Sequence, residues 1–97
     1  MTDVWTHGRW IVRPGQEDEL VRALTELSRA AQRELDAPLP TLLRDREQPN
    51  VFLTFACWAS DDDIERFRAF LFPRLGPLRK LLEGFEPHTL DRITFDE

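Results

Sequence analysis

The side chains best suited to chemistry in this chain gather near its start. His7 and Arg9 alternate with Trp5 along residues 4–12, VWTHGRWIV, so the three share one face of a predicted strand. A histidine can take up a proton near neutral pH, and an arginine can stabilise the oxyanion that proton removal leaves. We therefore predict His7 and Arg9 as the catalytic pair. The alternative for His7 is a buried imidazole that hydrogen bonds to a main-chain carbonyl.

Aromatic and cationic side chains elsewhere are predicted to form the walls of the same site. The predicted substrate-binding residues are Trp5, Arg44, Trp58, Phe67, Phe72 and His88. Each also has an ordinary structural explanation: phenylalanines at helical spacing often belong to the core, and Arg44 alternates with acidic residues that could form surface ion pairs with it.

No sequence pattern for a metal ion or a cofactor is present. The two histidines lie far apart, no H-x-x-E or C-x-x-C spacing occurs, and there is no glycine-rich phosphate loop or dinucleotide fingerprint. We therefore expect neither a metal nor a cofactor. Cys57, the single cysteine, lies within an apolar stretch, where a small buried side chain is a better prediction than a nucleophile or a disulfide partner.

Composition narrows the classes of partner. Thirteen basic against eighteen acidic residues give a net charge of −5, which argues against a nucleic-acid-binding surface. No run of 18 apolar residues and no basic-then-apolar leader is present, so we expect no membrane span and no signal peptide. These features together predict a cytoplasmic protein.

The pattern of strands and helices predicts a single α+β domain over residues 1–97. Strands are predicted at 4–12, 41–46, 51–58 and 86–95. One helix is predicted from 17 to a point before Pro38, a second begins after Ser60 and breaks at Pro73, and a last short helix ends near Gly84. The order is βαββαβ, a ferredoxin-like fold in which helices cover one face of a four-stranded antiparallel sheet.

The strand at 51–58 is apolar on both faces. Val51, Leu53, Phe55 and Cys57 alternate with Phe52, Ala56 and Trp58, with Thr54 among them. Helices would cover one of these faces, and leaving a Phe and a Trp of the other in water would forfeit about 2–3 kcal/mol each. A second copy of the sheet is the simplest cover, so we predict a homodimer formed through the sheet face.

Three segments, GRWIVRPGQEDEL, TLLRDREQPNVFLTFACWAS and LLEGFEPHTLDRI, span most of the chain. In this order and spacing they resemble the antibiotic biosynthesis monooxygenase (ABM) domain family of the dimeric α/β-barrel superfamily. The resemblance implies the dimeric ferredoxin-like fold. It leaves several activities open, because the superfamily includes cofactor-free quinone-forming monooxygenases, haem-degrading enzymes, polyketide cyclases, isomerases and members with no assigned reaction.

The haem-degrading branch of that superfamily uses an Asn on the first strand, a Trp on the second helix and a His soon after it. Here those regions hold His7-Gly8, Phe67 and no histidine between residues 70 and 80. The resemblance therefore favours a cofactor-independent monooxygenase acting on an aromatic or polyketide-like small molecule. Since the chain has no tyrosine, a mechanism that needs a tyrosine hydroxyl is excluded. The alternatives are a non-catalytic ligand-binding or accessory module, and a cyclase or isomerase.

Overall fold

Four strands form one antiparallel sheet in the spatial order β2-β3-β1-β4. The structure is a computed structural model, and residues 4–95 are described. Its elements are β1 (Val4–Val12), α1 (Glu17–Leu35), β2 (Thr41–Arg44), β3 (Val51–Trp58), α2 (Asp61–Leu71), the 3-10 turn η1 (Phe72–Arg74), α3 (Leu75–Arg79) and β4 (Leu82–Asp91). The predicted α+β, ferredoxin-like βαββαβ order is confirmed.

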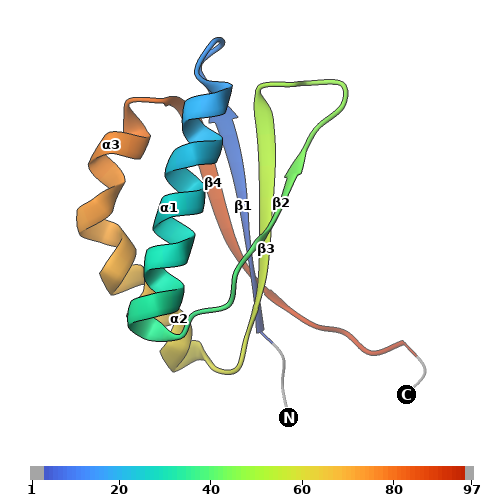
Figure 1. Ribbon diagram of the computed structural model, residues 1–97. Coiled ribbons are helices and arrows are strands. Elements are labelled where there is room, and N and C mark those ends of the chain that lie inside the picture. The colour runs from blue at the N-terminus through green and yellow to red at the C-terminus, as the bar shows by residue number, and fades with distance from the viewer. Residues whose placement is uncertain (1–3, 96–97) are drawn as a thin grey trace.

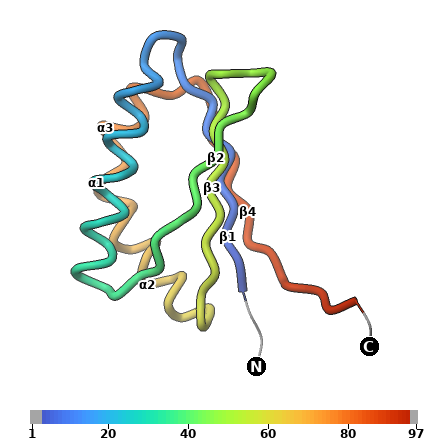
Figure 2. Tube along the Cα trace, turned by 45° about the vertical axis from the view of Figure 1, so that its right-hand side comes forward, coloured from blue at the N-terminus to red at the C-terminus, as the bar shows by residue number. Residues whose placement is uncertain are grey.

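The helices form one layer and the sheet forms the other (Figure 1). Viewed after a 45° turn, α1, α2 and α3 all lie on the same side of the strands, and the opposite side of the sheet carries no helix (Figure 2). We call these the helix face and the open face. Because successive side chains of a strand point to opposite sides, each strand contributes to both faces.

On β1, the helix face holds Val4, Gly8, Trp10 and Val12, all buried, with half-buried Thr6 among them. The alternate residues, Trp5, His7, Arg9 and Ile11, are half-buried on the open face. Cross-strand partners share a face, so Trp10 lies beside Phe52 of β3 and Phe85 of β4. The predicted alternation of β3 is therefore confirmed.

Two apolar clusters hold the layers together, one at each end of the sheet. One surrounds Trp58 and Ile64, and the other surrounds Trp10 and Leu20. Helix α1 contributes to both because its buried residues recur at helical spacing along its length. Between the two clusters lies the middle of the sheet, where the side chains are small.

The second helix begins where the sequence predicts. Ser60 is its N-cap, and its hydroxyl accepts a hydrogen bond from the Asp63 main-chain N–H at 3.2 Å. Such a bond satisfies one of the donors left free in the first turn. Helix α1 ends at Leu35, and its C-cap residue Asp36 adopts a left-handed conformation with φ of 56°.

The predicted boundaries of the last helix and of the last strand are wrong. The last helix ends at Arg79, and β4 begins at Leu82 rather than at Glu86. Pairing with β1 explains the difference, because Leu82 and Phe85 lie opposite Val12 and Trp10, so apolar spacing that suggested a helix is used by a strand. The predicted strand also extended to Phe95, but β4 ends at Asp91.

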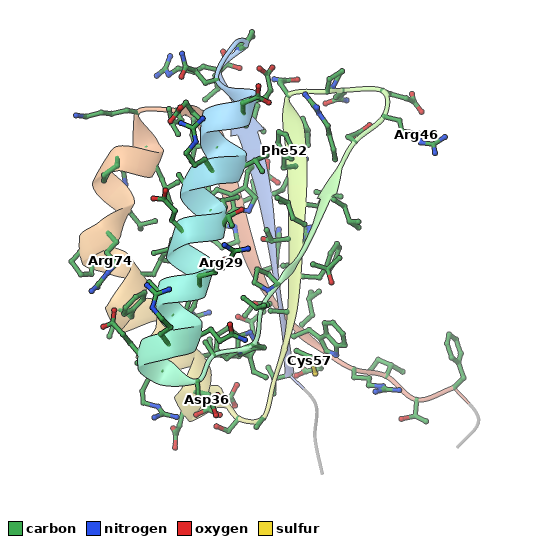
Figure 3. All side chains as sticks on the ribbon, viewed as in Figure 1. Arg29, Asp36, Arg46, Phe52, Cys57 and Arg74 are labelled. Atoms are coloured by element: carbon green, nitrogen blue, oxygen red, sulfur yellow. The ribbon has the colours of Figure 1, made fainter. Side chains whose placement is uncertain are left out.

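Two further predictions need correction. Strand β2 ends at Arg44 and not at residue 46, because Asp45 turns the chain by accepting hydrogen bonds from the main-chain N–H groups of Glu47 and Gln48. Cys57, predicted to be buried, is exposed. It lies near the end of β3 on the open face, away from the helices (Figure 3).

Among residues 4–95, no helix has the length and apolar character needed to cross a membrane.

Candidate functional site

A cavity of about 310 Å³ lies between the helix face of the sheet and the helices. Its floor is made of small residues, Gly8 of β1 and Thr54 and Ala56 of β3. Alternation brings these three residues together on one face of adjacent strands. The helices are kept apart from the sheet by larger side chains at both ends, so the small floor leaves space above it.

Two tryptophans, Trp10 and Trp58, stand at the two ends of this floor. Trp10 donates its indole N–H to Thr54 Oγ1 at 3.0 Å, and Trp58 donates its own to Thr6 Oγ1 at 2.9 Å. Each bond runs diagonally between β1 and β3. The indoles are thereby fixed with their polar atoms satisfied and their rings available as apolar walls.

Further aromatic rings complete the walls. Phe85 of β4 packs on Trp10 with ring centroids 4.1 Å apart, and Phe67 of α2 packs on Trp58 at 5.1 Å. Phe72 of η1 also lines the cavity, although most of its surface is exposed. Walls of this kind suit a planar apolar ligand.

The two threonines supply the polar chemistry of the floor. A hydroxyl has one O–H donor besides its acceptor lone pairs. Since Thr6 and Thr54 use acceptor positions for the indoles, each can turn its O–H toward an oxygen of a ligand. Ser28 of α1 lines the cavity from the opposite side. The arrangement can therefore hold an aromatic body and donate hydrogen bonds to an oxygen at its edge.

Helix α2 and strand β4 meet at one side of the cavity through Arg68. Its Nη2 donates to Thr89 Oγ1 at 2.8 Å, and its Nη1 lies 3.2 Å from a Glu65 carboxylate oxygen. Thr89 is the cross-strand partner of Thr6 and shares the helix face with it. The guanidinium thus spans from helix to sheet beside the lining.

Four of the predicted substrate-binding residues, Trp58, Phe67, Phe72 and His88, are among those that line this cavity. Arg44 does not lie in the lining. Its Nε donates to the Pro49 carbonyl at 2.7 Å, and its guanidinium lies over the Phe52 ring at 5.1 Å, near the turn between β2 and β3.

The predicted catalytic pair has its side chains on the other face of the sheet. The His7 ring stacks on Phe55, with centroids 4.6 Å apart, and on His88 at 5.8 Å. Phe55 lies on the open face of β3, and its cross-strand partner His7 on β1 shares that face. His7 and His88 are among the residues that line the cavity, while their rings stack on each other and the His7 ring stacks on Phe55. The catalytic role of His7 stays a prediction.

Arg9 and Trp5 share the open face with His7. Arg9 Nη1 lies 3.2 Å from a carboxylate oxygen of Glu86, its cross-strand partner on β4. Trp5 lies opposite Cys57 on one side and Leu90 on the other. The structure therefore separates the predicted residues into two groups on opposite faces of the sheet.

The sequence matches the family model for antibiotic biosynthesis monooxygenase over residues 4–69. This segment runs from β1 to α2 and includes most of the cavity lining. The chain belongs to the antibiotic biosynthesis monooxygenase (ABM) family. The resemblance inferred from the sequence is thereby confirmed.

Solved structures share the fold over nearly the whole chain. A mutant of SnoaB, a cofactor-independent oxygenase from Streptomyces nogalater, is 25% identical with a TM-score of 0.79, covering 98% of each chain. PA3566 from Pseudomonas aeruginosa is 23% identical with a TM-score of 0.80 and 97% of each chain covered. SO0527 from Shewanella oneidensis is 16% identical, with a TM-score of 0.79, and covers 94% of this chain and 91% of its own. No curated protein sequence matches the chain.

Sequence reasoning missed most residues of the ABM cavity, including Thr6, Trp10, Thr54, Arg68 and Phe85. The signal for the first three was present, since Thr6, Gly8 and Trp10 alternate on β1 as Thr54, Ala56 and Trp58 do on β3. What the sequence did not reveal is which face the helices cover. Arg68 had the appearance of a solvent-facing helix residue, and its reach to β4 follows from tertiary packing alone.

Among residues 4–95, no group of three or more His, Cys, Asp or Glu side chains is placed to hold a metal ion. His7 and His88 lie side by side but have no third ligand of these types close enough to complete such a group in the described part of the chain.

Proposed function

We propose that this ABM protein is a cofactor-independent monooxygenase that oxidises a planar aromatic or polyketide-like molecule bound between the sheet and the helices. The observation that carries the proposal is the aromatic-walled cavity of about 310 Å³, with threonine hydroxyls on its floor. Family membership and the similarity to SnoaB, a cofactor-independent oxygenase, support it.

The reaction needs few functional groups from the protein. An electron-rich anthrone or phenol that loses a proton can react with dioxygen directly, so the site has to bind the ring, take up the proton and stabilise the oxyanion. In anthrone oxidation the methylene carbon loses two hydrogens and gains one oxygen atom from dioxygen, and the second oxygen atom leaves as water. In this proposal Thr6 and Thr54 donate to the ring oxygen while Trp10 and Trp58 hold the ring, and the hydrogen bonds that join these residues in pairs support it.

The test is oxidation of anthrone under ¹⁸O₂ by the purified protein, with a chelator present and no added flavin, haem or metal. We expect anthraquinone carrying one ¹⁸O atom, formed faster than in the protein-free blank. Thr54→Val keeps the side-chain shape but removes the hydroxyl, so kcat/KM should fall about tenfold, the loss of one hydrogen bond.

Thr41→Val is the matched control, because Thr41 lies on β2 opposite Phe55, on the open face. Its kcat/KM should match that of the wild type. Equal losses in the two variants would remove the assigned role of Thr54, and wild-type protein that forms no quinone above the blank would overturn the proposed activity.

A non-catalytic binding module is the second candidate. It is favoured by the scarcity of ionisable side chains in the cavity, where Arg68 is the one Asp, Glu, Lys or Arg among the described lining residues. Binding of anthrone without oxygen uptake would support this candidate. A cyclase or isomerase would turn over its substrate without dioxygen, so the oxygen dependence of turnover separates it from an oxygenase.

We also propose that two copies of the chain pair through the open face. ABM proteins are typically dimeric. Here the open face exposes Leu43 and Leu90, at 48% and 40%, beside half-buried Trp5 and Phe55. A face with this much apolar surface and no helix over it suits a self-complementary interface.

A further inference from the structure

We propose that Arg68 makes the cavity selective for aromatic ligands that carry one anionic oxygen group, such as a phenolate, an enolate or a carboxylate. This inference rests on the proposed function, because it assigns the ligand class of the same cavity. Arg68 lies where α2 meets β4, and its charge distinguishes that side from the rest of the lining.

The interior of the cavity offers no charge to a ligand. Its walls are aromatic and aliphatic, and the two indole N–H groups are already bonded to Thr6 and Thr54. Arg68 is the single Asp, Glu, Lys or Arg side chain among the lining residues that the structure describes. A ligand anion placed anywhere except beside Arg68 would lose its hydration without gaining a countercharge. The position of the charge on the ligand is therefore set by one residue.

The guanidinium is held in place from two sides. Thr89 of β4 accepts from Nη2 at 2.8 Å, and Glu65, one helical turn before Arg68, accepts from Nη1 at 3.2 Å. The bond to Thr89 holds a long side chain across the gap between helix and sheet, which lowers the entropy lost when it binds a ligand. A guanidinium carries more N–H groups than these contacts use, so donors remain for a ligand oxygen.

Glu65 competes with a ligand for the same cation. Its side chain is 60% exposed and that of Arg68 is 55% exposed, so their ion pair is screened by solvent and is weak. A ligand carboxylate or phenolate that is partly desolvated against the aromatic walls can bind the guanidinium more strongly than Glu65 does. Removing the Glu65 charge should accordingly strengthen the binding of an anionic ligand.

Calorimetric titration with 2-naphthoate and with its neutral counterpart 2-naphthamide tests the proposal. The two probes share a fused ring and differ in charge. In Arg68→Ala, we expect the Kd of 2-naphthoate to rise about five- to tenfold, the range for losing a partly exposed charge-assisted hydrogen bond, and the Kd of 2-naphthamide to change less than twofold. In Glu65→Gln, 2-naphthoate should bind about twofold more tightly.

Arg22→Ala is the matched control. Arg22 is also a helix-surface arginine paired with a glutamate three residues before it, Glu19, but it lies on α1 outside the lining. It should leave the binding of both probes unchanged. Raising the salt concentration should weaken 2-naphthoate binding in the wild type and have little effect on it in Arg68→Ala, because screening acts on the charge that the variant lacks.

Equal loss of both probes in Arg68→Ala would mean that Arg68 only maintains the cavity, and would overturn its role in charge selection. Unchanged binding of 2-naphthoate in that variant would overturn this role as well. Wild-type protein that binds 2-naphthamide and 2-naphthoate equally well would overturn the inference while leaving the cavity intact. Failure to bind either probe would count against the cavity as a ligand site, and so against the proposed function together with this inference.

Discussion

Gly8 is the residue on which the shape of the cavity most depends. A Cβ atom at this position would lie 2.8 Å from Thr54 Oγ1, 2.9 Å from Trp10 Nε1 and 3.1 Å from Phe85 Cε1. Contacts this short force neighbouring atoms to move, and the first two atoms are the partners of one hydrogen bond. Position 8 therefore requires glycine, because its neighbours approach too closely for a side chain. The floor of the cavity is flat because Gly8 has no side chain.

We predict that Gly8→Ala lowers the free energy of unfolding by about 2 kcal/mol, the cost of forcing a methyl group into a packed site. Urea denaturation followed by tryptophan fluorescence measures it. Gly84→Ala is the control on β4, where the new Cβ would meet the flexible end of Ile11 at 3.2 Å. Its cost should be smaller by about 1 kcal/mol or more. Equal destabilisation by the two substitutions would show that the hydrogen-bonded Trp10 is not the obstacle.

At the scale of the element, the two long helices start in different ways. Ser60 caps α2 through its hydroxyl, whereas Gln16 at the start of α1 makes no side-chain cap hydrogen bond. Both helices have three acidic residues in their first turn, which interact favourably with the positive end of the helix dipole. The cap hydrogen bond is thus an added stabilisation that α2 has and α1 lacks. Its loss would loosen the segment that carries Phe67 and Arg68.

We predict that Ser60→Ala lowers the free energy of unfolding by about 1 kcal/mol, because the Asp63 N–H loses its acceptor. Gln16→Ala should change it by less than about 0.3 kcal/mol, as expected of a residue that makes no cap hydrogen bond. Chemical denaturation of the two variants side by side measures the difference. Similar changes in the free energy of unfolding for both variants would mean that water is an equally good hydrogen-bond acceptor for the Asp63 N–H in Ser60→Ala.

The element that the sequence described least well is β4. Leu78, Leu81, Leu82 and Phe85 have helical spacing, yet only Leu78 belongs to a helix. The long strand β1 needs a partner along its full length, and β4 pairs with it from Leu82 to Asp91. The backbone hydrogen bonds of this ladder outweigh a short local helix preference, since a helix of so few residues is marginal by itself.

At the scale of the whole molecule, the sheet separates two apolar faces with different roles. The helix face encloses the cavity, and the open face carries the stacked His7, Phe55 and His88 rings. The Arg9–Glu86 pair lies on the open face as well. In the proposed dimer these groups would lie at or near the contact between copies, which gives them a structural use independent of catalysis.

We predict that Leu90→Glu weakens self-association at least tenfold, which corresponds to about 1.4 kcal/mol, because it introduces a charge into an apolar interface and repeats it by symmetry. Leu39→Glu is the control, since Leu39 is 53% exposed in the connector after α1. Sedimentation equilibrium of both variants and of the wild type measures the effect. If a single charge is tolerated, Leu43→Glu is added to Leu90→Glu. A monomeric wild type, or a double variant that remains dimeric, would contradict the proposed interface.

The sequence by itself determined the order of elements, the ferredoxin-like fold and the two-sided apolar character of β3. These features are local: alternation of side chains follows from the geometry of a strand, and the caps and prolines that bound a helix act within a few residues. Trp58, Phe67 and Phe72, which the sequence suggested as aromatic walls, lie in the lining of one cavity, and their role in substrate binding stays a prediction.

Only the tertiary structure decided which face of the sheet lies under the helices. Alternation separates His7 from Gly8, but it assigns neither of them to the inside. That choice depends on where α1 and α2 pack, and packing is a property of the whole chain. The same reason explains Arg68, an exposed residue of α2 whose contact with Thr89 joins residues 21 positions apart.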